Sequence, residues 1–287
     1  MRKFFTACLM VAGMQMVSAQ EATWVPKNLA VGVGVGTTGI VIDASTTIHN
    51  YFGVRFGVDI MPKIKASGKL NLGLDANKSI QNLKSEYSSF LGNIDVPNKV
   101  EVEGKFNNTT WHFLIDVYPF GAKSSFHATV GAYFGPKEII NLYNKEQGLL
   151  SPVNQWNNAV IDNNLGVENM AGVELGDYFI TPNPDYKGDV AGRIEVAGFR
   201  PYLGLGFGRA VPKKRIGCQF DMGVQFWGRP DVIAPMYNKS AYPSKSGYTE
   251  GKLDKASVSG DDGGFIKTLS KITVYPVLNF RLVGRIL

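Results

Sequence analysis

The sequence predicts an all-β fold, an antiparallel transmembrane β-barrel of eight strands with three long extracellular loops. Three observations support this fold class. Hydrophobic side chains recur at every second position through most of the chain. Short and long connections between these segments alternate along the chain. The chain also begins with a segment typical of exported proteins.

The alternation is clearest between residues 52 and 60. The even positions from Phe52 to Ile60 are all apolar, whereas the odd positions carry glycine, arginine or aspartate. A period of two is typical of a strand with one apolar face. Six segments show it: Phe52–Ile60, 106–118, 125–135, 193–208, 215–227 and 271–286.

The segment from residue 29 to residue 48 precedes these six and contains a change of register. Val33 and Val35 occupy odd positions, whereas the apolar Ile40 and Ile42 occupy even ones. A hairpin at residues 36–39 explains the change and raises the total to eight strands. A β-bulge at the same place is the alternative and leaves seven. Because bacterial outer-membrane barrels have an even number of strands, we favour the hairpin.

The connections between strands alternate in length. Residues 49–51, 119–124 and 211–214 are short turns, whereas residues 65–105, 136–190 and 228–270 are long, polar and rich in Asn, Lys, Ser and Gly. Short turns at one rim and long loops at the other are typical of a bacterial outer-membrane barrel, with the short turns in the periplasm. Residues 171–180 are a candidate for an additional strand within the second loop.

Residues 1–19 have the layout of a signal peptide. Arg2 and Lys3 form a basic start, an apolar run follows, and the small residues Ser18 and Ala19 precede the expected cleavage site. We therefore expect residues 20–287 to form a single outer-membrane barrel domain. The apolar run is too short to cross a bilayer as a helix, which needs roughly 20 residues.

Composition excludes several other classes of protein. The whole chain has two cysteines, which is too few for a disulfide scaffold. With 44% hydrophobic residues and 19% charged residues, the chain is too apolar to be disordered. The net charge of +6 falls to +4 without the expected signal peptide, which contains Arg2 and Lys3 and no acidic residue. This charge is mild, and the chain has no run rich in Lys and Arg that would indicate a nucleic-acid partner.

Alternation alone does not decide whether the apolar face points inward or outward. A soluble β-sandwich buries its apolar face and gives the same pattern. Three features favour the membrane barrel. The polar faces are rich in glycine, the last strand runs almost to the chain end, and aromatic residues lie near strand ends as a membrane-interface girdle requires. These aromatic residues are Tyr51, Phe52, Tyr118, Phe120, Phe226 and Trp227.

The polar faces carry a group of charged and titratable side chains that we expect to meet inside the barrel. They are Arg55, Asp59, His112, Asp116, His127, Asp221 and Arg281. Buried charges need partners, so we predict cross-strand ion pairs and hydrogen bonds of a structural kind. An eight-stranded barrel is just wide enough for side chains to fill it, so no water-filled pore is expected.

We considered chemical sites and predict none, whether catalytic, cofactor-binding or metal-binding. His112 and His127 lie on strands joined by one short turn, and with Asp116 they are a possible metal site or acid–base pair. No ligand spacing such as H-x-x-x-H supports that interpretation. Residues 34–39 match the dinucleotide motif G-x-G-x-x-G, but strand-forming residues follow where the motif needs a helix.

Four short motifs resemble a known family of proteins. They are residues 36–40 with 54–57, residues 116–121, residues 201–206 and residues 275–278. In this order they are similar to small Gram-negative outer-membrane β-barrel proteins of poorly defined function. The resemblance implies the same barrel fold and supplies no catalytic residues. Such barrels usually end on an aromatic residue, whereas this chain ends on Ile286 and Leu287.

The sequence therefore predicts an integral protein of the cell outer membrane that is not an enzyme. Its expected role is structural, or binding at the surface through the long loops. A small porin-like diffusion channel is the alternative, and a hydrolase at the rim or in the lumen is a further one. The expected partners are outer-membrane lipid and, during biogenesis, the barrel-assembly machinery. The sequence does not indicate a surface ligand.

Overall fold

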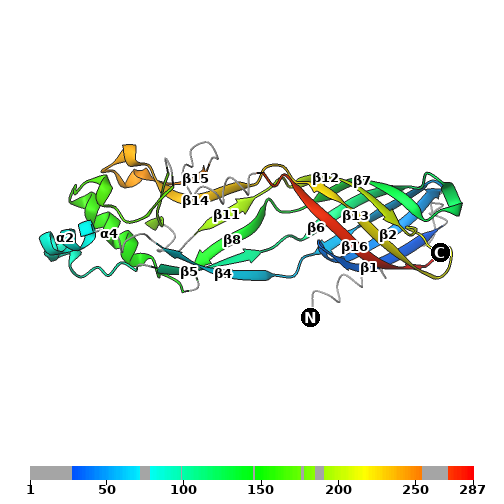
Figure 1. The fold of residues 1–287 in the computed structure, drawn as a ribbon, viewed down its shortest axis with the longest axis horizontal. Helices are drawn as coiled ribbons and strands as arrows, with labels where there is room; N and C mark the ends of the chain where they lie inside the picture. Colours follow the sequence, from blue (N-terminus) through cyan, green and yellow to red (C-terminus); the bar gives the residue numbers. More distant parts are fainter. Residues whose placement is uncertain are drawn as a thin grey trace, which may run out of the picture.

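The computed structural model describes residues 28–71, 78–97, 99–144, 146–175, 178–184, 191–253 and 271–287. The molecule is elongated, with a β-barrel at one end and an extension of strands and helices at the other (Figure 1). The predicted signal peptide, residues 1–19, lies outside the described residues.

Eight antiparallel strands close the barrel, in the order β1-β16-β13-β12-β7-β6-β3-β2. Closure is direct, because β1 pairs with β16 from Ala30 opposite Arg285 to Gly36 opposite Asn279. The predicted fold class and strand number are confirmed. The strands are β1 (Leu29–Gly36), β2 (Gly39–His49), β3 (Phe52–Ile60), β6 (Thr110–Val117), β7 (Phe126–Phe134), β12 (Phe199–Phe207), β13 (Ile216–Phe226) and β16 (Val274–Arg285).

The change of register near residue 36 is a hairpin, not a bulge. β1 and β2 pair without interruption up to Gly36 opposite Gly39. Gly39 has φ +105°, and a Cβ there would lie 2.3 Å from the carbonyl oxygen of Ile60. This position therefore requires glycine, which explains how so tight a turn is accommodated.

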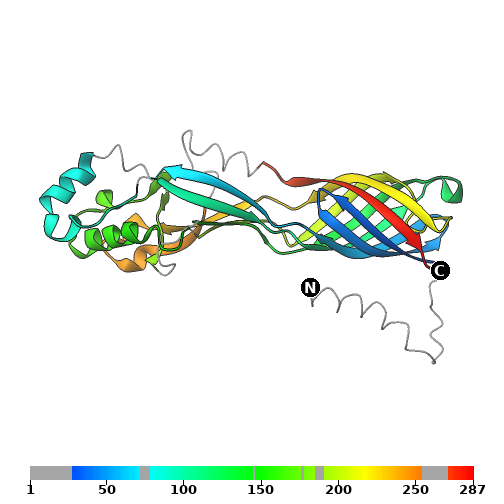
Figure 2. The ribbon, with the colours of Figure 1, turned by 90° about the horizontal axis from the view of Figure 1, so that it is seen from below.

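The three long connections form a second sheet and not only loops, which corrects the expectation from the sequence. Its order is β4-β5-β8-β11-β14-β10-β9, and β15 pairs with β14. Figure 2 shows these strands continuing away from the barrel as a curved extension. The strands are β4 (Ile64–Asn71), β5 (Lys99–Phe106), β8 (Glu138–Asn144), β9 (Val173–Leu175), β10 (Tyr178–Ile180), β11 (Gly192–Glu195), β14 (Asp231–Tyr237) and β15 (Tyr248–Leu253).

Two segments predicted as single strands are each divided in two. The segment 106–118 breaks between β5 and β6, and the segment 193–208 breaks between β11 and β12. Arg200 joins the two breaks, because its guanidinium donates to Asn108 Oδ1 and to the carbonyl of Ala197. The breaks lie where the closed barrel gives way to the open sheet. The strand proposed within residues 171–180 is present as the β9–β10 pair.

Helices cap the far end of the extension and add to the predicted all-β architecture. They are α2 (Lys78–Glu86), α3 (Ser88–Leu91) and α4 (Ser151–Asp162), with short 3₁₀ turns at Gly121–Lys123, Val167–Asn169, Lys239–Ala241 and Lys245–Gly247. Val153, Trp156 and Val160 of α4 are buried together with Phe179 and Tyr237. The far end therefore has a hydrophobic core separate from the barrel. No helix among the described residues is long and apolar enough to cross a membrane.

Candidate functional site

The first group of polar side chains inside the barrel surrounds the guanidinium of Arg55. Arg55 Nη2 donates to Asp116 Oδ1 at 2.7 Å, and Nη1 donates to Asp221 Oδ2 at 2.9 Å. The hydroxyl of Thr129 donates to the same oxygen of Asp116 at 2.8 Å. His127 Nε2 lies 2.9 Å from Asp221 Oδ1. Since β3, β6, β7 and β13 all contribute, the group spans the width of the barrel.

The second group links Arg281, Asp43, His112 and Asp59. Arg281 Nη1 forms an ion pair with Asp43 Oδ2. His112 lies between two carboxylates, with Nδ1 2.6 Å from Asp59 Oδ2 and Nε2 3.7 Å from Asp43 Oδ2. Thr38 donates its hydroxyl hydrogen to Asp59 Oδ1 at 2.8 Å. Each carboxylate in this group therefore faces an arginine or a histidine.

Gln219 connects the two groups. Its Oε1 atom accepts a hydrogen bond from Arg281 Nη2. Its Nε2 atom donates to Asp116 Oδ2 at 3.3 Å. A single amide thus joins Arg281 of the second group to Asp116 of the first. Among the described residues, the interior network holds four aspartates, two arginines and two histidines.

All seven side chains predicted to face the interior are there, and each is at most 3% exposed. The structure does not bring the two histidines to one carboxylate, because His112 bonds to Asp59 and His127 bonds to Asp221. Asp43 and Gln219 also belong to the network although neither was predicted as a site residue. Both residues could have been identified from the alternation, because they occupy odd positions of β2 and β13 and the odd positions of both strands face inward.

A layer of larger side chains closes the interior on the side of the extension. Tyr133, Tyr202, Leu114 and Val277 pack together there, all at most 4% exposed. The rings of Tyr133 and Tyr202 meet edge to face with centroids 5.5 Å apart. The ring of His112 lies 5.5 Å from that of Tyr133, so the layer rests directly on the second polar group.

The opposite mouth is closed by the connection between β12 and β13, which folds into the barrel. Ala210 is fully buried, and Val211 packs with Ala30 and Val283. The amide of Ala210 donates to Tyr118 Oη at 2.8 Å, and its carbonyl accepts from the hydroxyl of Ser45 at 2.6 Å. The connection therefore fills the mouth, and both backbone groups of the buried Ala210 have hydrogen-bond partners.

We call the connection between β12 and β13 the plug, since Ala210 and Val211 fill the mouth. Replacing Tyr118 with phenylalanine tests the attachment of this plug. The ring stays in place but the buried amide of Ala210 loses its acceptor, so the free energy of unfolding should fall by about 1–3 kcal/mol. Urea unfolding of the folded protein in detergent micelles, followed by tryptophan fluorescence, measures the change. An unfolding midpoint equal to that of the wild type would show that this bond does not hold the plug.

The outer surface of the barrel is apolar. Val33, Phe56 and Leu205 are about half exposed to the surroundings, at 51%, 54% and 49%. A soluble sandwich would bury these side chains and expose Arg55 and its neighbours, which is the reverse of what is found. An apolar exterior around a polar interior is the arrangement of a transmembrane barrel.

The chain is an outer-membrane β-barrel protein. The turns that join β2 to β3, β6 to β7 and β12 to β13 lie at the end remote from the extension, where the C-terminus also lies (Figure 2). That end is periplasmic by the usual rule, so the extension is extracellular.

Comparison with known proteins gives neither a family nor a relative in sequence. No family model matches the chain, and no curated protein matches it. Among solved structures, CarO of Acinetobacter baumannii is similar with a TM-score of 0.43 and 14% identity, over 91% of this chain and 97% of that one. CarO2 of the same organism has a TM-score of 0.43 and 16% identity, over 90% and 98%.

A major outer membrane protein of Thermus thermophilus is similar with a TM-score of 0.35 and 13% identity, over 90% of this chain and 98% of that one. Likenesses at this level carry no argument about function. The assignment of this outer-membrane barrel rests on its own closed sheet and on the distribution of its side chains.

The predicted aromatic girdle is only partly correct. Phe52 and Phe120 are exposed on the exterior as expected, at 45% and 68%. Tyr118 and Trp227 point inward instead. Tyr118 holds the plug, and the indole nitrogen of Trp227 donates to the carbonyl of Ile272 at 3.0 Å. Each ring faces the protein because its hydrogen-bonding group has a partner there and would have none among lipid chains.

One cluster in the interior has the composition of a metal site. The ligand atoms of Asp116, His127 and Asp221 all lie within 4.8 Å of one another. The guanidinium of Arg55 already bridges the two carboxylates and supplies the positive charge that a cation would bring. Among the described side chains, the hydrogen-bond partners of His112 and His127 are carboxylates, Gln219 and backbone carbonyls, and not a serine or cysteine nucleophile.

Proposed function

We propose that the barrel is a closed, non-enzymatic anchor that holds the extracellular extension at the cell surface, where the extension has a structural or binding role. The observation that carries the proposal is the continuous filling of the interior. The plug around Ala210, the two polar groups and the layer around Tyr133 succeed one another from the periplasmic mouth to the extension. Outer-membrane lipid and the barrel-assembly machinery are the partners that such an anchor needs.

The ion pairs of the interior support a closed state rather than a conducting one. A channel lined by charges leaves them in water, whereas Arg55 and both of its carboxylate partners are nearly inaccessible. Separating Arg55 from Asp116 and Asp221 would leave uncompensated charges in a narrow interior, which costs several kcal/mol. This cost disfavours an open pore in the resting protein.

The extension has the packing expected of a folded surface module. Tyr242 Oη donates to the carbonyl of Val160 at 3.1 Å and accepts from the amide of Gly166 at 2.8 Å. In the second sheet, Arg193 of β11 donates hydrogen bonds to Glu250 and Glu195, and these bonds raise the pKa of its guanidinium. A rigid body of this kind presents a defined surface, as recognition at a cell surface requires.

Planar-bilayer conductance tests the proposal. We expect the purified, refolded wild-type protein to show no steady conductance under conditions in which a general porin inserted in parallel conducts. Folding is verified by the heat-modifiable migration of the barrel in gel electrophoresis. A steady, ohmic conductance from the unmutated protein would refute the closed anchor and favour the porin-like alternative.

A further inference from the structure

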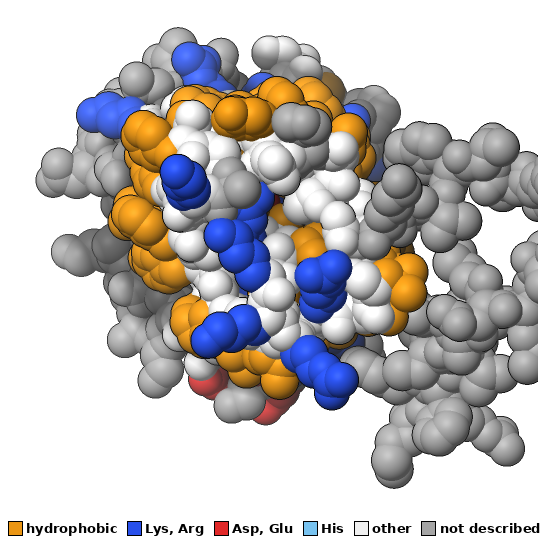
Figure 3. All heavy atoms as spheres, turned by 90° about the vertical axis from the view of Figure 1, so that its right-hand side faces the viewer, with side chains coloured by type: hydrophobic (Ala, Val, Ile, Leu, Met, Phe, Trp, Pro, Cys, Tyr) orange, Lys and Arg blue, Asp and Glu red, His pale blue; other side chains and the backbone are white. Residues whose placement is uncertain are grey.

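The periplasmic end of the barrel is strongly basic. Figure 3 looks onto this end and shows several Lys and Arg side chains around the closed mouth. The basic residues of its described turns and chain end are Lys123, Arg209, Lys213, Lys214, Arg215 and Arg285. The segments that carry them, residues 118–125, 208–216 and 284–287, contain no Asp or Glu. This end therefore attracts anions.

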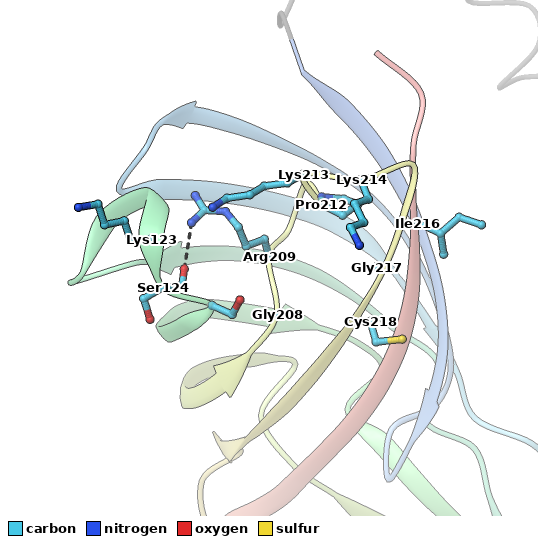
Figure 4. A pocket seen from close by; sticks show the side chains of 11 residues that line it. Lys123, Ser124, Gly208, Arg209, Pro212, Lys213, Lys214, Ile216, Gly217 and Cys218 are labelled. Carbon is cyan, nitrogen blue, oxygen red and sulfur yellow. Dashed lines mark hydrogen bonds between the residues drawn. The ribbon is translucent and has the colours of Figure 1, made fainter.

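A cavity of about 220 Å³ lies within this basic surface, between the β6–β7 turn and the β12–β13 connection. Lys123, Arg209, Lys213 and Lys214 line it, together with the small polar residues Ser124 and Ser125. Figure 4 shows the labelled basic side chains coming from the two turns. The cavity thus combines positive charge with hydroxyl groups, which are the groups that bind a phosphate.

Arg209 lines the cavity, and its partners among the described residues are carbonyl groups and an aromatic ring, which leave its positive charge unpaired by a carboxylate. Its guanidinium donates to the carbonyls of Gly121 and Ser124, both at 3.1 Å, and of Asn50 at 3.2 Å. It also lies 4.3 Å from the centre of the Tyr118 ring. These contacts tie three periplasmic turns together. Within the described part of the chain, no carboxylate side chain neutralises the lysines beside it.

One wall of the cavity belongs to the lipid-facing surface. Ile216 is 71% exposed, and Cys218, two residues along the same strand, points out of the barrel beside it. Phe207 precedes Gly208 of the lining, is 62% exposed and packs against Phe126 with ring centroids 5.5 Å apart. The basic cavity therefore opens beside an apolar surface, at the depth where membrane headgroups meet acyl chains.

We propose that this cavity, between the β6–β7 turn and the β12–β13 connection, binds the phosphate of an anionic glycerophospholipid in the periplasmic leaflet, with an acyl chain against Ile216 and Cys218. The periplasmic leaflet of an outer membrane consists of glycerophospholipids, each with a phosphate at this depth. Lys213 and Lys214 contact the phosphate, and Arg209 holds the turns in place. Binding fixes the depth and tilt of the anchor in the bilayer.

Native mass spectrometry of the full chain in dodecylmaltoside micelles, titrated with phosphatidylglycerol, tests the proposal. We expect one tightly bound phosphatidylglycerol on the wild type. The K213Q/K214Q variant should bind it roughly tenfold to thirtyfold more weakly, because two interfacial lysines are lost. The matched control K63Q/K137Q removes the same charge from exposed lysines between the barrel and the extension and should bind as the wild type does. Equal weakening in both variants would overturn the proposal.

Competition distinguishes the lipid from other anions. Millimolar inorganic phosphate, or a polyglutamate peptide, should not displace the lipid, since neither has an acyl chain. Displacement by either would show a site for free anions or for acidic protein segments and would overturn the lipid assignment. A second measurement needs no variant. Phosphatidylglycerol should slow the alkylation of Cys218 by a maleimide, and an unchanged rate would contradict the proposed position of the acyl chain.

Discussion

Replacing Arg281 with alanine should lower the free energy of unfolding of the barrel by about 3–5 kcal/mol, the largest effect that we expect from a single substitution in the interior. Arg281 is 1% exposed and forms an ion pair with Asp43. Without it, the nearest group able to carry a positive charge beside Asp43 is His112 Nε2, 3.7 Å away. Gln219 loses its hydrogen-bond donor as well.

The double variant D43N/R281M is the matched control. It removes both charges and keeps side chains of similar length, so most of the lost stability should return. Urea unfolding in micelles, with folding verified by heat-modifiable migration, measures both variants. If R281A and the double variant were equally unstable, the loss would come from packing and not from the uncompensated carboxylate of Asp43.

Arginine in place of Met222 should cost about 2–4 kcal/mol, because this side chain lies on the lipid-facing surface near the middle of β13. Met222 is 48% exposed and its neighbour across the sheet is Leu205. The same substitution at Ile216, at the periplasmic end of the same strand, should cost only about 0–1 kcal/mol, since arginine there reaches the headgroups.

Reversible folding into phospholipid vesicles measures this difference in depth. The two positions share a strand and a face, so they differ chiefly in their distance from the membrane centre. If this barrel were surrounded by water and not by lipid, both positions would face water and both substitutions would be nearly neutral. Equal costs at Met222 and Ile216 would therefore contradict the position of the barrel in the membrane.

The sequence by itself determined the barrel, its number of strands and which side chains face inward. The period of two belongs to each strand separately, because successive side chains point to opposite faces of a sheet. Arg55, Asp116 and Asp221 could therefore be placed on the polar face of their own strands. The glycine content of the polar faces and the aromatic residues near the strand ends then favoured the interior of a barrel for that face. The change from odd to even positions around Gly36 indicated a hairpin or a bulge, and the even number of strands in such barrels favoured the β1–β2 hairpin that the structure has.

Only the tertiary structure decided which interior groups bond to one another. Arg55 and Asp221 are 166 residues apart in the chain. They meet because the stagger of the closed barrel brings β3 and β13 to the same depth across the interior, although the two strands are not neighbours in the sheet. Alternation carries no information about this stagger, so the partners of His112 and His127 could not be assigned from it.

The extension and the plug were also decided by tertiary structure. Residues 64–68 of β4 are exposed on both faces, so burial does not hold this strand in place, and it exists because β5 pairs with it. The connection after β12 resembles any short turn in sequence. It folds into the barrel because Val211 is buried beside Ala30 and Val283, a surface that forms only when β1 and β16 close the sheet.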